Sequence, residues 1–365
     1  MKDCQIVLLE LIKKYLHPSY QIKIPAEADW LQVYSEAEMQ NVIAVAWISI
    51  KTLQEYGMFT VGNNKSIQML VMRWFGMSNM NFQRYKEYQT AIQHLSRFFA
   101  SNHLKMMIMK GYGCSLNYPY PECRPCGDID VWMFGKQKIA DQLVRKNLDL
   151  YVDDNNEHHS VFQYESFTVE NHGTIQDINI HKSDVYVNTI LEKLASEEQH
   201  ETEINGVKIQ LPSAKFNSIH LLRHMACDFA TFTTTLRHVL DWSTFVSNNV
   251  NNIDWAFIRS VAHKANMHKF LDAINGICVE YLGYPKDMFP VEKIDYKLRD
   301  RVLFDILNNH AKPDIPKPNL SFFQKIQYGL YKTSRMWKNR WKYQIVYDES
   351  FLQSFLTLTL NRIKN

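Results

Sequence analysis

The 365-residue sequence contains no apolar run that approaches membrane-spanning length, and it has no internal repeat or low-complexity tract. The first absence argues against a membrane-spanning protein. The first residues, MKDCQIVLLELIKKYL, also lack a small-residue cleavage site, and Glu10 interrupts their short apolar run. This segment therefore predicts an amphipathic helix rather than a signal peptide, and we expect a cytoplasmic protein.

An excess of charge of one sign is also missing. The 41 Lys and Arg residues nearly balance the 38 Asp and Glu residues, which leaves a formal net charge of +3. This balance does not by itself indicate a nucleic-acid partner, and none is expected. The hydrophobic content of 46% is ample for a sizeable core, and the length suffices for two or three structural units.

Cysteine is scarce as well. Six cysteines in a chain of this length do not form a disulfide scaffold. Cys123 and Cys126 have the C-x-P-C spacing of a dithiol redox motif, but that motif requires a following helix, and here Gly127 and a predicted strand follow. Zinc would need a second pair, which is not close in sequence. We interpret the two thiols as incidental loop residues, with redox or zinc chemistry as the alternative.

The most informative stretch is residues 104–133, LKMMIMKGYGCSLNYPYPECRPCGDIDVWM. It predicts an apolar strand, a turn with Gly111 and Gly113, and a second strand that carries Asp128 and Asp130. Residues two apart in a strand share a face, so both carboxylates point the same way. Carboxylates held this close indicate a divalent cation, for which Mg²⁺ is the natural choice.

The glycines of this stretch add a second indication. A strand that ends in glycines exposes backbone N–H groups that can receive phosphate oxygens, because no Cβ stands in the way. A metal site next to a phosphate-binding turn predicts phosphoryl or nucleotidyl transfer.

The order of these features resembles the nucleotidyltransferase superfamily. More closely, Met109-Lys110-Gly111, then Arg124, then Gly127-Asp128-Ile129-Asp130 is similar to a bacterial family of uncharacterised nucleotidyltransferases, with the pattern LKG, Arg and GDIDLLV. The resemblance implies metal-dependent transfer of a nucleoside monophosphate from an NTP to an unknown acceptor, either a small molecule or a protein. Asp128 and Asp130 would hold Mg²⁺. Gly111 and Gly113 would donate backbone hydrogen bonds, and Lys110 or Arg124 would bind phosphate.

Two residues compete to be the third carboxylate. Strands are predicted at residues 160–164, 167–172 and 174–181; the second contains Glu170 and the third Asp177. The family has a Val-Glu-x-His strand that matches Glu170, so we favour Glu170 as metal ligand or as acceptor of the substrate proton. His172 and His181 either have a functional role or are surface or core histidines with satisfied hydrogen bonds.

The segments HLLRH, at residues 220–224, and LRHVLDW, at residues 236–242, resemble the helical part of the same family. Asp228 stands where relatives tend to carry histidine. Arg237 and Asp241 are one helical turn apart and predict an ion pair. The alternative is that Arg237 or His238 meets nucleotide phosphates.

We therefore predict an α+β fold, with a nucleotidyltransferase-like mixed β-sheet core flanked by N- and C-terminal helical regions. The units are an N-terminal helical region at residues 1–100, the core at 101–212, a helical domain at 213–312, and a linker with basic-aromatic helices at 313–365. In the first unit, Met69, Met72, Trp74 and Phe75 form a stripe that we expect in the core.

The basic and aromatic residues of the last unit, which include Lys325 and Arg335, are interpreted as packing on the protein rather than as a nucleic-acid or membrane surface. The competing functional hypothesis is a non-catalytic protein of the same fold that binds or regulates a partner, as in a toxin-antitoxin pair.

Overall fold

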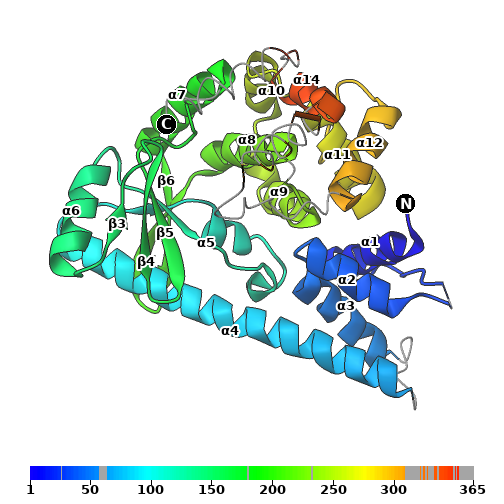
Figure 1. The fold of residues 1–365 in the computed structure, drawn as a ribbon. Helices are drawn as coiled ribbons and strands as arrows, with labels where there is room; N and C mark the ends of the chain where they lie inside the picture. The colour runs from blue at the N-terminus through cyan, green and yellow to red at the C-terminus, as the bar shows by residue number, and fades with distance from the viewer. Residues whose placement is uncertain are drawn as a thin grey trace.

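The computed structural model describes residues 1–25, 27–56, 64–178, 181–231 and 233–308, and in the C-terminal region residues 321, 324, 327, 333–334, 337–347, 350 and 352. Within this part of the chain the fold is α+β. A seven-stranded mixed sheet lies at one end of the molecule, and helices cover it and extend away from it (Figure 1).

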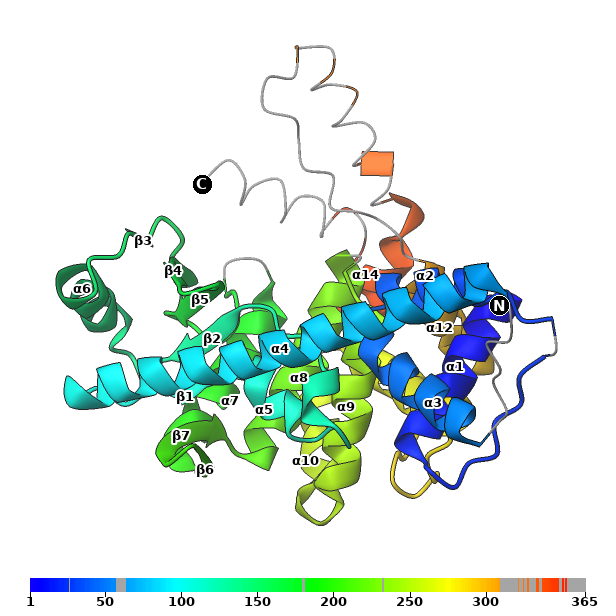
Figure 2. The same ribbon diagram turned by 90° about the horizontal axis from the view of Figure 1, so that it is seen from below.

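The N-terminal helices are α1 (Asp3–Leu16), α2 (Trp30–Met39), α3 (Ile43–Glu55) and α4 (Lys65–Ser101). The 37-residue α4 runs from this group of helices to the sheet, and seen from below it crosses the strands (Figure 2). Trp74 is buried, and its indole N–H donates to the carbonyl of Ile43 over 2.8 Å. For the other three residues of the predicted core stripe the prediction is wrong, because Met69, Met72 and Phe75 are exposed.

The sheet has the order β3-β4-β5-β2-β1-β7-β6. Its strands are β1 (Met107–Ile108), β2 (Ile129–Trp132), β3 (Val152–Asp153), β4 (His159–Tyr164), β5 (Phe167–His172), β6 (Gln199–Ile204) and β7 (Val207–Pro212). β2 pairs with β5 and β1 with β7 in parallel, and the other neighbours are antiparallel. The two strands predicted at 160–164 and 167–172 are confirmed as β4 and β5.

The strand predicted at 174–181 is wrong over its described residues, since 174–178 form bends and a turn. The side-chain oxygen of Asn188 accepts the backbone N–H groups of Ile175 and Gln176 at 2.9 and 3.0 Å. These donors are therefore satisfied without a neighbouring strand. His181 occupies the N-cap position of the helix α7 (Lys182–Glu197), and its ring stacks on Tyr347.

Alternation along β2 separates the two faces of the sheet. Ile129 and Val131 pack with residues of α4 and of α6 (Gln137–Asn147) in one hydrophobic cluster. Trp132 points the other way and belongs to the larger cluster formed by the helical part of the molecule. Asp130 shares the face of Trp132, so the predicted placement of the carboxylate away from the Ile129 side is correct.

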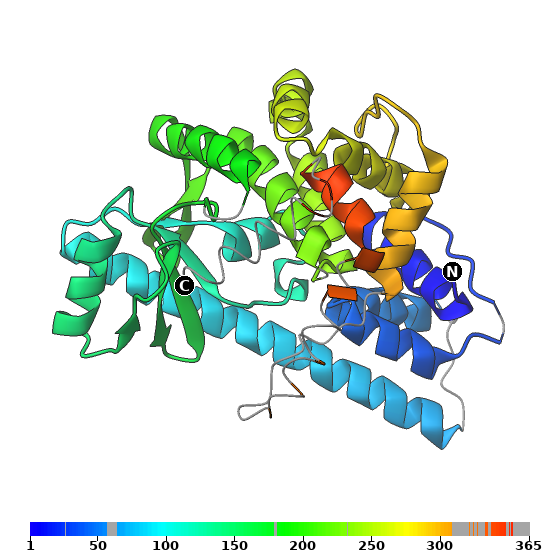
Figure 3. The same ribbon diagram turned by 45° about the horizontal axis from the view of Figure 1, so that its top comes forward.

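The remaining helices belong to the helical part of the molecule, on the Trp132 side of the sheet. They are α5 (Lys110–Ser115), η1 (Pro121–Cys123), α8 (Ala214–Thr231), α9 (Leu236–Asn248), η2 (Val250–Asn252), α10 (Trp255–Lys264), α11 (His268–Leu282), α12 (Tyr296–Asn308) and α14 (Arg340–Val346). α8 and α9 lie between the sheet and the group α11, α12 and α14 (Figure 3). No helix among the described residues is long and apolar enough to cross a membrane.

The short helix α14 packs against α8 and α11, as the packing interpretation predicted for this part of the tail. The ring of Trp341 meets that of Phe229 at 5.5 Å between centroids, and Lys342 is buried in an ion pair with Asp305. The predicted linker around Pro313, and with it Lys325 and Arg335, lies outside the described residues.

Candidate functional site

The parallel pairing of β2 and β5 builds the centre of the site. Asp130 is the register partner of Glu170, and Trp132 is that of His172. Since alternate residues share a face, Glu170 and His172 lie on the same side of the sheet as Asp130. The His172 Nε2 atom is 3.1 Å from Asp130 Oδ1 and 3.7 Å from Glu170 Oε2. One ligating atom from each of the three residues fits within a span of 4.8 Å.

Lys110 joins this group from the start of α5. Its Nζ atom is 3.0 Å from Asp130 Oδ1, and the Lys110 and Asp130 side chains are only 17% and 11% exposed. Burial by itself raises the pKa of Asp130, but Lys110 and then His172 hold this pKa well below its usual value. Asp130 is therefore a carboxylate with a cationic partner, Lys110, and an imidazole, that of His172, both at hydrogen-bond distance.

Gly111 explains how Lys110 reaches this position. Gly111 has a φ of +35°, and a Cβ built there would lie 2.2 Å from the Tyr88 hydroxyl oxygen. That hydroxyl donates to the backbone carbonyl of Asp128 over 2.9 Å and so ties α4 to the start of β2. Only glycine permits both the backbone conformation and the close approach of Tyr88.

The turn predicted around Gly111 and Gly113 is instead the short helix α5, which begins at Lys110. Gly113 lies inside α5, where a Cβ would make only an ordinary contact of 3.6 Å with Leu211. The positive φ at Gly111 changes the direction of the chain between β1 and α5. The turn predicted from two glycines therefore requires glycine at position 111 but not at position 113. Phosphate binding by the two backbone N–H groups stays a prediction.

Asp128 lies just before β2 and is exposed. Partial burial of the carboxyl group raises the pKa of Asp128, and the charge of Asp130 raises it further. Among the described residues, the compact group contains Glu170 but neither Asp128 nor Asp177. The structure thus brings Glu170 to Asp130, whereas direct ligation by Asp128 stays a prediction.

Histidines surround the carboxylates in a way that the sequence analysis missed. The rings of His158 and His159 lie 5.0 and 5.6 Å from that of His172, and His159 Nε2 is 4.0 Å from Glu170 Oε1. Burial, followed by the neighbouring His172, lowers the pKa of His158 to about 3. The Nδ1 atoms of His159 and His172 are buried without a hydrogen-bond partner. Carboxylate oxygens next to imidazole nitrogens fit a divalent cation.

A second group of polar side chains lies on α8. His220, His224 and Asp228 follow one another at four-residue spacing and so share one helical face. Burial is the main cause of the lowered pKa values of His220 and His224, and the charges of Lys110 and Asp130 act on both. We call this face of α8 the α8 stripe.

The α8 stripe is completed by His238 from α9. His238 Nε2 lies 3.1 Å from Asp228 Oδ2, and His224 Nε2 lies 3.4 Å from the same oxygen. Against the effect of burial, His224 and His238 lower the pKa of Asp228. The sequence signal for this group was the HLLRH segment with a carboxylate four residues later, but nothing local indicated what it would face.

Arg124 occupies a different environment. Its Nε and Nη2 atoms donate to the two carboxylate oxygens of Asp241 at 2.8 and 3.0 Å, and the pair is almost fully buried. Tyr118 donates to Asp241 Oδ1 at 2.8 Å, and Arg237 Nη1 lies 3.3 Å from Oδ2, so the predicted Arg237–Asp241 ion pair is confirmed. The cation that the structure brings to the sheet carboxylates is thus Lys110, and phosphate binding by Arg124 stays a prediction.

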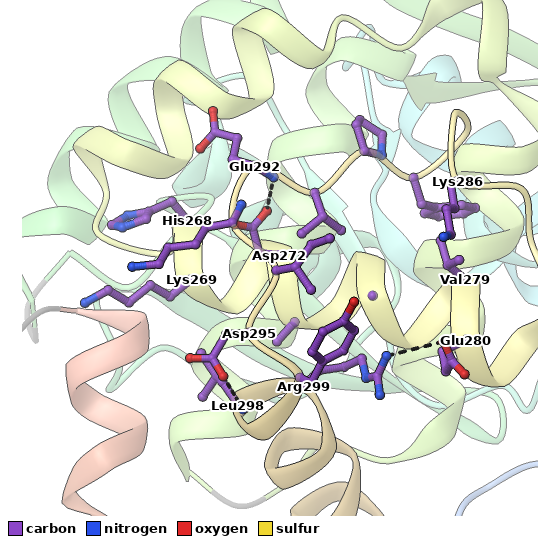
Figure 4. Close-up of a pocket in the computed structure, with 18 of the residues that line it drawn as sticks. His268, Lys269, Asp272, Val279, Glu280, Lys286, Glu292, Asp295, Leu298 and Arg299 are labelled. Atoms are coloured by element: carbon purple, nitrogen blue, oxygen red, sulfur yellow. Dashed lines mark hydrogen bonds and ion pairs between the residues drawn. The ribbon is translucent and has the colours of Figure 1, made fainter.

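A cavity of about 660 Å³ lies elsewhere, between α11, the start of α12 and the loop that joins them (Figure 4). Asp272 accepts the backbone N–H groups of Glu292 and Lys293 at 3.0 and 3.1 Å and thereby fixes the loop. None of the residues that line the cavity belongs to the sheet carboxylates or to the α8 stripe. The cavity is therefore separate from the candidate site.

A mixed sheet carries paired carboxylates on the neighbouring strands β2 and β5, and Lys110 and Gly111 follow β1 at the start of α5, an arrangement that fits a nucleotidyltransferase. The chain belongs to the family described as uncharacterised nucleotidyltransferases, whose sequence profile matches residues 26–283. A similar solved structure is that of an antigenic nucleotidyltransferase-like protein from Paracoccidioides brasiliensis, with 15% identity and a TM-score of 0.33 over 45% of this chain and 77% of the other. A likeness this weak carries no argument. No curated protein matches the chain.

Proposed function

We propose that this protein is a metal-dependent nucleotidyltransferase that transfers a nucleoside monophosphate from an NTP to an acceptor and releases pyrophosphate. The acceptor is a small molecule or a protein with a hydroxyl or similar group, and the expected compartment is the cytoplasm. The observation that carries this proposal is the convergence of Asp130, Glu170 and His172 beside Lys110, in a chain that belongs to a nucleotidyltransferase family.

In this proposal Asp130 and Glu170 hold the divalent cation, with His172 or Asp128 as a further ligand. Mg²⁺ is the expected ion, because carboxylate oxygens are its preferred ligands. When bound, the cation neutralises charge on the triphosphate during in-line displacement. Lys110 is close enough to the carboxylates to contact a phosphate held there, and the backbone of Gly111 and Gly113 supplies hydrogen-bond donors.

One observation supports the alternative of a non-catalytic regulatory protein. Lys110 already forms an ion pair with Asp130, and His172 Nε2 lies 3.1 Å from the same oxygen, so protein groups contact this carboxylate without a metal ion. A binding module of a toxin-antitoxin type would retain such a site for its stability. The two hypotheses differ in whether a cation and an NTP bind together.

The test is thermal unfolding of the wild-type protein with Mg²⁺ or Mn²⁺, with a non-hydrolysable NTP, and with both. A ligand that binds only the folded state raises the melting temperature by mass action. We expect the largest rise with both ligands, and Asp130→Asn should remove the metal-dependent part of it. Asp287→Asn, which changes an exposed loop carboxylate, is the matched control. Equal shifts with and without metal would indicate simple anion binding.

A further inference from the structure

We propose that the cavity between α11 and the start of α12 binds a small organic anion with an apolar body. The cavity has a volume of about 660 Å³, and none of its lining residues belongs to the sheet carboxylates or to the α8 stripe. The inference therefore goes beyond the proposed transfer reaction and assigns a second ligand to the protein.

The cavity runs along one face of α11. Ala273, Gly276 and Val279 line it and recur at three-residue spacing, so they lie on the same side of the helix. The loop after α11 and the first turn of α12 supply further apolar lining residues, namely Phe289, Pro290, Val291, Ile294 and Leu298. An apolar lining of this kind favours a ligand whose body leaves water when it binds.

Hydrogen bonds within the protein hold the walls of the cavity in place (Figure 4). Asn275 Nδ2 donates to the carbonyl of Pro290 over 2.8 Å, and Asp272 fixes the next residues of the loop. Arg299 Nη1 lies 3.4 Å from Glu280 Oε2 and joins α12 to α11. The cavity is thus formed without a ligand, and its volume lies within the range of about 300–1,000 Å³ that is usual for small-molecule sites.

The charged residues of the lining indicate the sign of the ligand. Each of the four acidic residues already has a partner within the protein: Asp272 the loop backbone, Glu280 the side chain of Arg299, Glu292 that of His263, and Asp295 the backbone N–H of Leu298. The three lysines, in contrast, have no hydrogen-bond or ion-pair partner among the described residues; they are Lys269, Lys286 and Lys293. Cations without partners beside an apolar surface favour a negatively charged group on the ligand.

The positions of the lysines orient the ligand. Lys269 lies in the first turn of α11 and Lys286 follows the end of this helix, so the two mark opposite ends of the cavity (Figure 4). Lys293 belongs to the Lys269 end, because its backbone N–H donates to Asp272, one helical turn from Lys269. Two of the three lysines therefore lie at this end. The anionic group binds there, and the apolar body extends toward Val279.

The first test is isothermal titration calorimetry of the wild-type full chain with hexanoate, octanoate and decanoate, each below its micelle concentration. We expect the affinity to rise about fourfold for each added CH₂ group, because each group buries apolar surface. Octyl phosphate should bind as well, since a lysine recognises a headgroup by its charge rather than by its shape. No binding, or an affinity that does not depend on chain length, would overturn the proposal.

The second test locates the ligand. Val279→Trp should fill the cavity and abolish octanoate binding. Val185→Trp, on the surface of α7, is the matched control and should bind octanoate as the wild type does. Urea denaturation checks that both variants fold. Octanoate affinity that is unchanged in a folded Val279→Trp protein would overturn the assignment to this cavity.

The third test examines the charge and does not alter the core, because both lysines are exposed. Lys269→Gln combined with Lys293→Gln should weaken octanoate binding at least about twofold and leave the binding of uncharged octanol unchanged. Lys297→Gln, an exposed lysine of α12 outside the cavity lining, is the control. An equal effect on octanoate and octanol, or no effect on octanoate, would overturn the anionic assignment.

None of these titrations requires nucleotidyl transfer. Absence of transfer in the wild type would remove the proposed function and leave the cavity proposal standing. Absence of octanoate binding would remove the cavity proposal and leave the proposed function standing.

Discussion

Asp130 and Glu170 are register partners on the parallel strands β2 and β5 and lie on the same face of the sheet. Two carboxylates in this arrangement repel each other unless positive charge lies beside them. Lys110 lies 3.0 Å from Asp130 and supplies that charge, and His172 Nε2 lies 3.1 Å from the same oxygen. The arrangement is therefore tolerated by the folded chain and also fits a divalent cation.

The first prediction concerns the glycine that positions Lys110. Gly111→Ala should lower the free energy of unfolding by about 1–3 kcal/mol, because its Cβ would overlap the Tyr88 hydroxyl. Gly113→Ala is the matched control and should cost far less, since the space beside it is adequate. Urea denaturation measures both.

A double variant checks the stated cause. In a Tyr88→Phe background the overlapping hydroxyl is absent, so Gly111→Ala should cost less than in the wild type. An equal cost in both backgrounds would show that the positive φ of Gly111, rather than Tyr88, requires glycine.

The second prediction concerns the buried ion pair of Arg124 and Asp241. Arg124→Ala should destabilise the protein by about 3–5 kcal/mol, because it leaves a buried carboxylate without its bidentate partner. Arg124→Lys should also destabilise, since an ammonium cannot reproduce the two parallel hydrogen bonds. If Arg124→Ala keeps its stability but loses NTP affinity, the residue binds phosphate as the family resemblance implied.

The third prediction decides between the two candidates for the third carboxylate. Glu170→Gln should abolish the metal-dependent rise in melting temperature, because Glu170 lies within the compact group and Asp177 does not. Asp177→Asn should retain the rise. The reverse result would move the metal site away from β5.

The fourth prediction is a pH dependence of stability. The pKa of His224 is about 4 in the folded protein because of burial, against about 6.5 in an unfolded chain. Between these values the unfolded state binds a proton that the folded state does not, so stability falls as the pH falls.

His224 changes the free energy of unfolding by at most about 1.4 kcal/mol per pH unit. Solvent screening reduces this contribution, because the side chain is partly exposed. His224→Gln should therefore flatten the loss of stability between pH 6.5 and 4, measured by urea denaturation, and His200→Gln should not. Parallel curves for wild type and His224→Gln would contradict the burial of this ring.

The sequence predicted features that depend on neighbouring residues. Alternation along 128–132 placed Asp130 on one face, and the family's Val-Glu-x-His pattern favoured Glu170, which lies beside Asp130 in the structure. Features that depend on distant residues were missed. Asn188 accepts the backbone N–H groups of Ile175 and Gln176, where a strand was predicted. Asp241, 117 positions away in the sequence, accepts hydrogen bonds from Arg124. The approach of His238 from α9 to Asp228 on α8 is likewise set by packing, which no local pattern encodes.

The central claim is tested most directly by label transfer. Wild-type protein with Mg²⁺ and each of the four NTPs, labelled with ³²P at either the α- or the γ-phosphate, would be incubated in a lysate of the source cell. The account predicts that an acceptor gains the α-label and that the γ-label leaves in pyrophosphate. The Asp130→Asn variant should neither label an acceptor nor release labelled pyrophosphate. Transfer of the γ-label alone, or no α-labelling above the Asp130→Asn control with any NTP, would contradict it.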